Sequence, residues 1–198
     1  QVAPLADDAD RFVAALKGWP AGQLNACVYA AAVMASLQSE LASPTLAAAH
    51  GQQGRIRLGM VGGGRDAFIG AVHRIAARID GHYDLVAGAF SSTPEKSKAS
   101  GADLGIDPKR AYGDFAEMAR AEARRKDGIQ AVAIVTPNHM HAPAAREFLK
   151  RGIHVICDKP LTATLPEAKK LAAAAAASDA LFVLTHNYTG YPMIRQAQ

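Results

Sequence analysis

The sequence of 198 residues predicts an α/β fold built on a doubly wound parallel sheet. From about residue 55, short apolar runs alternate with helix-like segments of roughly ten to fifteen residues, which is typical of βαβ units. The run at 131–136 (AVAIVT) is apolar throughout, as expected for a central strand covered on both faces. A glycine cluster directly follows the first run, where a ligand-binding turn would lie.

The expected elements follow one another regularly along the chain. Strands are predicted at 56–61, 84–90, 131–136, 154–158 and 181–186, each separated from the next by one or two helices. The helices are expected at about 67–79, from the 91–98 loop into Leu104, from Asp114 to about 125, near 143–150, and after Thr164. Thr164 lies three residues before Glu167 and forms a capping box, with Pro166 in the first turn.

The first 54 residues differ in character from the rest. They are rich in alanine and predict two helices, about 5–17 and 22–42, followed by a linker. We therefore expect a helical N-terminal extension (1–54), a nucleotide-binding domain (55–190), and the start of a further domain (191–198). The run at 26–37 resembles a signal peptide core in length. It begins too far into the chain, however, and an amphipathic or buried helix is the better interpretation.

Charge and cysteine content exclude several classes of protein. The net charge is +4, but the basic residues are scattered along helices rather than clustered with aromatics, so no nucleic-acid partner is expected. No apolar stretch is long enough to cross a bilayer, so no membrane partner is expected either. Cys27 and Cys157 lie in apolar runs without metal-ligand spacing, which predicts buried thiols and fits a cytoplasmic location.

The glycine cluster at 59–70 is the first candidate site. Gly62, Gly64 and Ala67 match the G-x-G-x-x-A form of the dinucleotide fingerprint. Gly62 would allow a tight turn, Gly64 the approach of a pyrophosphate, and Ala67 close packing of the following helix. We expect the next residue, Phe68, to adjoin the cofactor as well. The alternative is a tight turn in another α/β protein, including a methyltransferase.

The second candidate site follows the second strand. An NAD-specific domain usually carries an acidic residue there, but this chain has Ser91, Ser92 and Thr93, with Lys96 close behind. Hydroxyls and a lysine accommodate a 2′-phosphate, which a carboxylate would repel. The sequence therefore favours NADP over NAD, or the use of both. The alternative is a helix-capping loop with Thr93 as the cap, and the two interpretations are compatible.

Two more candidate sites lie at strand ends. In the segment TPNHMH, we expect Thr136, Pro137, Asn138 and His141 to contact the cofactor, although Asn138 could simply cap a helix. Its two histidines lack a third ligand nearby, so no metal site is predicted. In CDKP, Lys159 could bond a substrate hydroxyl or the nicotinamide and stabilise developing negative charge; a surface lysine before a proline turn is the alternative.

Taken together, GMVGGG, TPNHMH and DKP resemble the glucose–fructose oxidoreductase, inositol dehydrogenase and rhizopine-catabolism family (Gfo/Idh/MocA) over about residues 56–195. The resemblance implies a Rossmann domain in which Lys159 is catalytic beside the nicotinamide and substrate. It also implies that Asp158 and Pro160 adjoin the cofactor and that the bond to Pro160 is cis. His186, Asn187 and Tyr188 would face the substrate, and the 91–96 segment looks like the NADP-using branch.

The activity implied by the resemblance is NAD(P)-dependent hydride transfer at a secondary alcohol of a sugar or cyclitol. The family's second domain should begin near residue 190 and would supply a D-x-x-x-H pair for proton transfer. We therefore expect the chain alone to bind cofactor but turn over poorly. The alternatives are a non-catalytic nucleotide-binding module needing a partner chain, and a different Rossmann enzyme. A homo-oligomer is allowed, but the sequence does not specify one.

Overall fold

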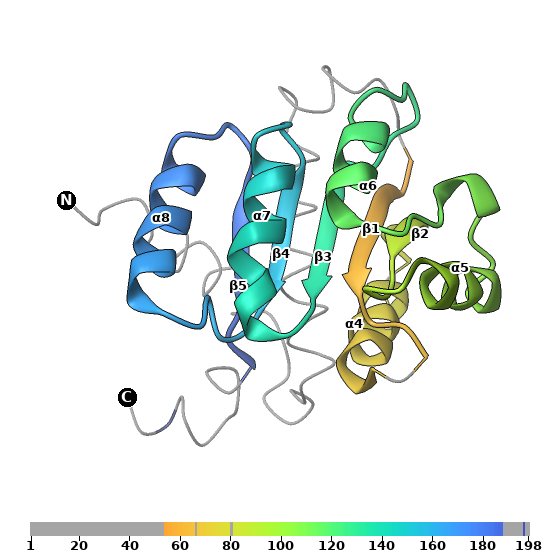
Figure 1. Cartoon of the computed structure of the whole chain (residues 1–198), viewed down its shortest axis with the longest axis horizontal. Coiled ribbons are helices and arrows are strands. Elements are labelled where there is room, and N and C mark those ends of the chain that lie inside the picture. The colour runs from red at the N-terminus through yellow and green to blue at the C-terminus, as the bar shows by residue number, and fades with distance from the viewer. Residues whose placement is uncertain (1–53, 66, 80, 188–195, 197–198) are drawn as a thin grey trace.

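The computed structural model describes residues 54–65, 67–79, 81–187 and 196, which form a five-stranded sheet flanked by helices (Figure 1). All strand pairs are parallel and the strand order is β2-β1-β3-β4-β5. The strands are β1 (Ile56–Gly62), β2 (Tyr83–Ala89), β3 (Ala131–Val135), β4 (His154–Asp158) and β5 (Phe182–Thr185). The prediction of a Rossmann-type parallel sheet is therefore confirmed. The expected helices at 5–17 and 22–42 lie outside the described residues.

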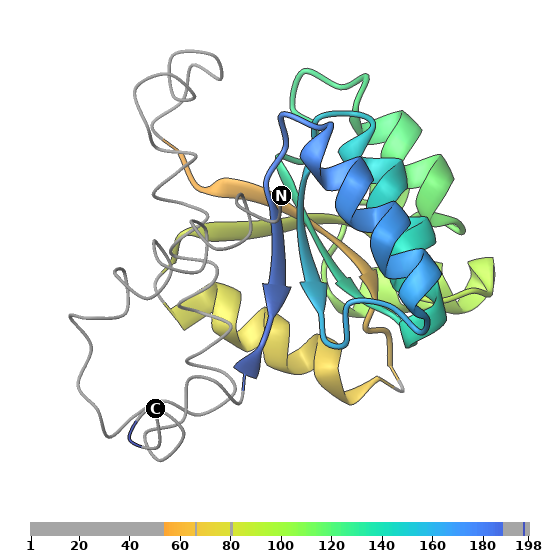
Figure 2. The ribbon, with the colours of Figure 1, turned by 90° about the vertical axis from the view of Figure 1, so that its left-hand side faces the viewer.

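Helices cover both faces of this sheet. They are α4 (Phe68–Ile79), α5 (Pro94–Asp103), α6 (Phe115–Glu122), α7 (His141–Leu149) and α8 (Leu165–Ala176), with short 3₁₀ turns η1 (Pro108–Arg110) and η2 (Asn138–Met140). Figure 2 shows α4 on one face and α6, α7 and α8 on the other. The first connection runs from β1 to β2 through α4, and the next returns from β2 past β1 to β3 through α5 and α6. Because both connections are right-handed crossovers but run in opposite directions across the sheet, their helices cover opposite faces.

The central strand β3 explains why its sequence is apolar throughout. Ala131, Ala133 and Val135 pack in the core on the α4 side of the sheet, together with Leu58 and Met60. The alternate residues, Val132 and Ile134, pack in the opposite core, against residues of α6 and α7. Burying one side chain of this size stabilises a fold by about 1.5–3 kcal/mol, so a polar residue on either face of β3 would be costly.

Two helix starts predicted from the sequence are confirmed. The Asp114 carboxylate accepts a hydrogen bond of 2.8 Å from the Glu117 amide and caps α6. Thr164 caps α8, since its Oγ1 lies 3.5 Å from the Glu167 amide and donates to the Glu167 carboxylate at 3.0 Å. Thr93 occupies the N-cap position of α5 but makes no side-chain cap bond. The alternative interpretation of the 91–96 loop as a helix cap is thus correct about the place of Thr93, but its side chain does not cap the helix.

A buried ion pair secures the end of α6. The Glu122 carboxylate accepts hydrogen bonds from both the Nε and Nη2 atoms of Arg110. It also accepts from the Tyr112 hydroxyl at 2.8 Å and from the Ile129 amide at 3.1 Å. Glu122 is 1% exposed and Arg110 7%, so the charges are compensated inside the fold and not by water. The cluster joins α6 to the loop that enters β3.

Candidate functional site

The parallel sheet gathers the predicted site segments at one edge. Because every strand runs the same way, the loops after β1, β2, β3, β4 and β5 all leave from the carboxyl edge. Hydrogen bonds join neighbouring segments at this edge, between two loops in one case and between two strand ends in the other. The Gly64 amide donates to the Phe90 carbonyl at 3.2 Å, and the Thr185 hydroxyl donates to the Asp158 carboxylate at 2.7 Å.

The glycine turn after β1 needs glycine at each of its three positions. Gly62 and Gly63 have φ angles of +82° and +72°, which side chains other than glycine rarely adopt. A Cβ on Gly64 would lie 2.7 Å from the Phe90 carbonyl oxygen and 2.8 Å from Ser100 Oγ. The turn therefore exposes bare backbone before α4, whose first N–H groups have no partner one turn earlier in the helix.

The packing role predicted for Ala67 is wrong, because that role belongs to Gly70. Gly70 is buried in the first turn of α4, and a Cβ there would lie only 2.3 Å from the Gly63 Cα atom. Ala67 precedes the helix and is partly exposed. Ala67 lies on the wall of a cavity beside the turn and not in the close helix–turn contact. The signal that could have found Gly70 is a glycine within the first turn of the predicted helix, where alanine would be the better helix former.

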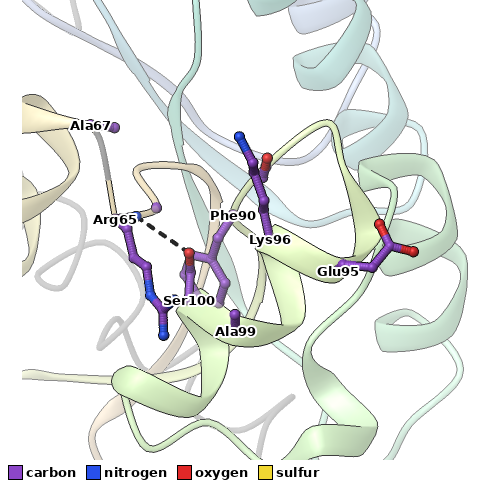
Figure 3. Close-up of a pocket in the computed structure, with 9 residues that line it drawn as sticks. Arg65, Ala67, Phe90, Glu95, Lys96, Ala99 and Ser100 are labelled. Atoms are coloured by element: carbon purple, nitrogen blue, oxygen red, sulfur yellow. Dashed lines mark hydrogen bonds between the residues drawn. The ribbon is translucent and has the colours of Figure 1, made fainter.

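A cavity of about 580 Å³ lies between the glycine turn and α5 (Figure 3). Its wall brings together residues from three segments: Gly64, Arg65, Ala67, Phe90, Ser91, Glu95, Lys96, Ala99 and Ser100. Of the residues predicted here, Gly64, Ala67, Ser91 and Lys96 line it, whereas Ser92 does not. Phe68 is 82% exposed at the first position of α4.

Two arginines at the glycine turn were missed by the sequence reasoning. The Arg74 guanidinium donates a hydrogen bond of 2.7 Å to the Gly63 carbonyl and so holds one peptide plane of the turn. Burial, together with the nearby Arg78, lowers the pKa of Arg74. The Arg65 amide donates to Ser100 Oγ at 3.3 Å. A basic residue on a helix or turn usually indicates only a solvated face, so the sequence carried no specific signal for either.

His141 is a buried link between two backbone segments, and its predicted contact with the cofactor stays a prediction. Its side chain is 1% exposed, with Nδ1 at 2.7 Å from the Pro160 carbonyl oxygen and Nε2 at 2.9 Å from the Thr136 carbonyl oxygen. It therefore joins the end of β3 to the loop after β4. Pro137 and Asn138 are exposed beside it. Thr136 Oγ1 is buried and has no hydrogen-bond partner in the described part of the chain.

The loop after β4 carries the expected cis peptide bond between Lys159 and Pro160, and Lys159 is exposed at the carboxyl edge. Just before it, Asp158 Oδ1 lies 3.9 Å from Nε2 of His73, a buried residue of α4. Burial acts to raise the pKa of the Asp158 carboxyl, but His73 and Thr185 outweigh burial and hold that pKa below its usual value. The carboxylate therefore connects α4 to β5.

The predicted substrate residues lie at the end of β5. His186 is exposed, and Asn187 is partly buried, its Oδ1 lacking a partner among the described residues. Tyr188 lies outside the described residues. In the part of the chain that the structure describes, no group of three His, Cys, Asp or Glu side chains could hold a metal ion, and no helix is long and apolar enough to cross a membrane.

Comparison with known proteins agrees with this geometry. Residues 56–186 match the family model described as an oxidoreductase family with an NAD-binding Rossmann fold. The uncharacterized oxidoreductase YfiI of Bacillus subtilis is 39% identical over 142 residues, which is 71% of this chain and 36% of that protein. An oxidoreductase structure from Sinorhizobium meliloti is 75% identical with a TM-score of 0.69, covering 73% of this chain and 40% of that one.

A further solved structure carries bound ligands. An inositol dehydrogenase homolog from Azotobacter vinelandii, complexed with NADH and myo-inositol, is 46% identical with a TM-score of 0.69. The match covers 73% of this chain and 38% of that one. The present chain thus spans between a third and two fifths of the length of these relatives.

Proposed function

The chain belongs to the Gfo/Idh/MocA oxidoreductases, and on that premise we propose that residues 55–190 bind NAD(P) for hydride transfer at a secondary alcohol of a sugar or cyclitol. The observation that carries the proposal is the glycine turn. No Cβ fits at Gly64, and the following helix begins at Phe68 with its N–H groups directed toward the same edge. Such bare backbone before a helix N-terminus fits a pyrophosphate.

In this proposal the chain's own residues divide the work of binding. Gly62 and Gly64 let the pyrophosphate approach the backbone, while Ser91 and Lys96 take the adenosine ribose. On the other side of the turn, the residues expected to adjoin the cofactor are Phe68, Thr136, Pro137, Asn138, Asp158 and Pro160. His141 also fixes the Thr136 and Pro160 carbonyl groups relative to each other.

Lys159 is the proposed catalytic residue. When bound, the nicotinamide supplies the hydride-accepting or hydride-donating carbon. The ammonium group of Lys159 would stabilise negative charge that develops on the substrate oxygen during the transfer. Asp158 restrains the backbone just before Lys159 through its contacts with His73 and Thr185. Proton transfer to the substrate hydroxyl would fall to a residue of the family's second domain.

A sugar or cyclitol substrate is supported by the names of the relatives. They include a levoglucosan dehydrogenase of Pseudarthrobacter phenanthrenivorans, 28% identical over 144 residues, which is 72% of this chain and 36% of that protein. His186, Asn187 and Tyr188 would face such a substrate. A cytoplasmic location and a homo-oligomer stay predictions from the sequence.

The choice of cofactor is proposed to favour NADP. No acidic residue directly follows β2, and the first carboxylate, that of Glu95, points away from the Lys96 ammonium (Figure 3). A 2′-phosphate placed near Ser91 would therefore meet hydroxyls and a cation. Among the relatives, a D-xylose 1-dehydrogenase of Haloferax volcanii carries NADP(+) in its name, so both cofactors occur in the family.

Calorimetric titration of the purified chain with NADPH and NADH tests the proposal. We expect NADPH to bind more tightly than NADH. Gly64→Val should abolish binding of both, because its side chain would collide with the Phe90 carbonyl. Gly152→Val serves as the control, since Gly152 also carries a backbone cost at φ +70° but meets no atom within 4 Å. A folded chain that binds neither nucleotide would overturn the proposal.

A further inference from the structure

We propose that Arg65 reads the 2′-phosphate of NADP and that Asp103 competes with this phosphate for the Arg65 guanidinium. The inference rests on the proposed function, because it assigns the cofactor preference of that site to two residues. Neither residue is one of the positions that define the fingerprint, although Arg65 occupies one of its variable positions. They lie 38 positions apart in the chain and meet only because α5 packs along the glycine turn.

The geometry places the Arg65 side chain on the wall of the cavity. Its backbone amide is anchored to Ser100 Oγ at 3.3 Å, so the side chain begins inside the site (Figure 3). From there it reaches Asp103, the last residue of α5. Nη2 donates to Oδ1 at 2.7 Å and Nε donates to Oδ2, which is a two-pronged contact. The carboxylate thus occupies both donors of one edge of the guanidinium.

A phosphate matches the same pair of donors. The planar guanidinium binds carboxylate and phosphate oxygens in the same forked arrangement. A 2′-phosphate carries a charge of roughly −1.5 to −2, whereas the Asp103 carboxylate carries one negative charge. Lys96 also lines the cavity, so its wall carries a second cation besides Arg65. An exchange of Asp103 for phosphate is therefore favoured by charge.

The pair is weak enough to be exchanged. The Arg65 side chain is 59% exposed and that of Asp103 48%, and ion pairs at such positions contribute little because water and salt screen them. The Arg65 hydrogen bond is the main cause that lowers the pKa of the Asp103 carboxyl, so the carboxylate stays ionised at neutral pH. Asp103 would thus reduce, but not prevent, recognition of the phosphate.

The experiment uses two small nucleotides that differ only in the phosphate under test. Adenosine 2′,5′-bisphosphate and adenosine 5′-monophosphate are titrated into the full chain by calorimetry at low ionic strength. Removing the competing carboxylate with Asp103→Asn should tighten binding of the bisphosphate about two- to fivefold, which is the range expected for a weak exposed pair. Arg65→Gln should weaken it about tenfold, as loss of a charge-assisted contact predicts. Neither variant should change monophosphate binding.

A second ion pair in the chain provides a matched control. Arg55 contacts Asp84 at 3.0 Å with side-chain exposures of 59% and 51%, close to those of the first pair, yet neither residue lines the cavity. Arg55→Gln and Asp84→Asn should leave binding of both nucleotides unchanged. If they shift it as much as the test variants do, the effect is one of net charge and the inference is wrong.

The outcomes separate this inference from the function on which it rests. If the folded chain binds neither nucleotide, the proposed function itself fails. If it binds the monophosphate but Asp103→Asn and Arg65→Gln leave the bisphosphate affinity unchanged, only the inference fails. If Arg65→Gln does not fold, Asp103→Asn alone tests the inference. This variant should fold, because the carboxylate that it removes is at an exposed position.

Discussion

Replacing Gly70 by alanine should destabilise the fold and disable the glycine turn. On helix propensity alone, alanine is favoured over glycine by about 0.8–1 kcal/mol. In this structure, however, the new Cβ would lie 2.3 Å from Gly63 Cα and 2.8 Å from its carbonyl oxygen. An ordinary carbon–carbon contact is about 3.5–4.0 Å, so α4 and the turn would have to separate by more than 1 Å.

The two effects can be weighed against each other. Forcing a methyl group into packed atoms costs about 1–3 kcal/mol, and here the upper end applies because the obstructing atoms are backbone. After subtracting the propensity gain, the variant should lose about 1–2 kcal/mol of unfolding free energy. Moving the turn by about 1 Å should also weaken NADPH binding tenfold to a hundredfold.

Urea unfolding followed by circular dichroism, with NADPH titration of the same samples, measures both effects. Ala71→Gly is the control, because Ala71 is exposed on the same helix. It should lose about 1 kcal/mol from propensity and bind NADPH normally. A Gly70→Ala protein that is more stable than the wild type and binds NADPH equally tightly would refute the close approach of Gly70 to Gly63. The predicted packing role of Ala67 would then stand.

Three further predictions concern buried charge and thiol chemistry. Glu122→Ala should cost about 3–5 kcal/mol of unfolding free energy, because it leaves the Arg110 guanidinium buried without the Glu122 carboxylate. Urea unfolding measures this loss, and a loss near zero would contradict the buried ion pair. The lowered pKa of Asp158 stabilises the fold above the ordinary carboxyl pKa of about 3.9, and this stability is lost as pH falls through the folded value. The stability difference between wild type and Asp158→Asn should therefore shrink on acidification. A difference that grew as the pH fell would mean that folding raises the pKa of Asp158, contrary to this prediction. Burial and, to a smaller extent, Asp158 raise the pKa of the Cys157 thiol to about 12. In a Cys27→Ser background, Ellman's reagent should react at pH 8 only after denaturant is added, and fast reaction with the native protein would show that the thiol is exposed.

The sequence predicted the elements well where the signal is local. The apolar run of β3 and the capping residue Thr164 act through residues within one turn or one strand, so their patterns are visible in the sequence. The meeting of the strand-end segments followed from parallel topology alone. The family resemblance added the cis peptide bond at Pro160, which local patterns do not reveal.

The site was predicted less completely, because several of its contacts join distant segments. Ala67 satisfied the fingerprint spacing, but only the fold shows that Gly70 lies against Gly63. His141 has the residue type of a ligand, and the sequence does not show that both ring nitrogens meet backbone carbonyls. His73 lies far from Asp158 in the chain and carried no motif of its own.

The position of β1 inside the sheet, between β2 and β3, has a consequence for how the domain is made. β1 comes first among the described strands, but its partner β3 lies more than seventy residues later, with Leu58 opposite Ala131. The nucleotide turn is bounded by Val135 as well as by Phe90 and Gly70, so it is completed only when these separate segments have assembled. Such distant pairing slows folding. A nucleotide that binds only the finished turn would favour the folded chain by about 2.7 kcal/mol at a hundred times its Kd, so a cell's cofactor pool would help newly made chains to persist.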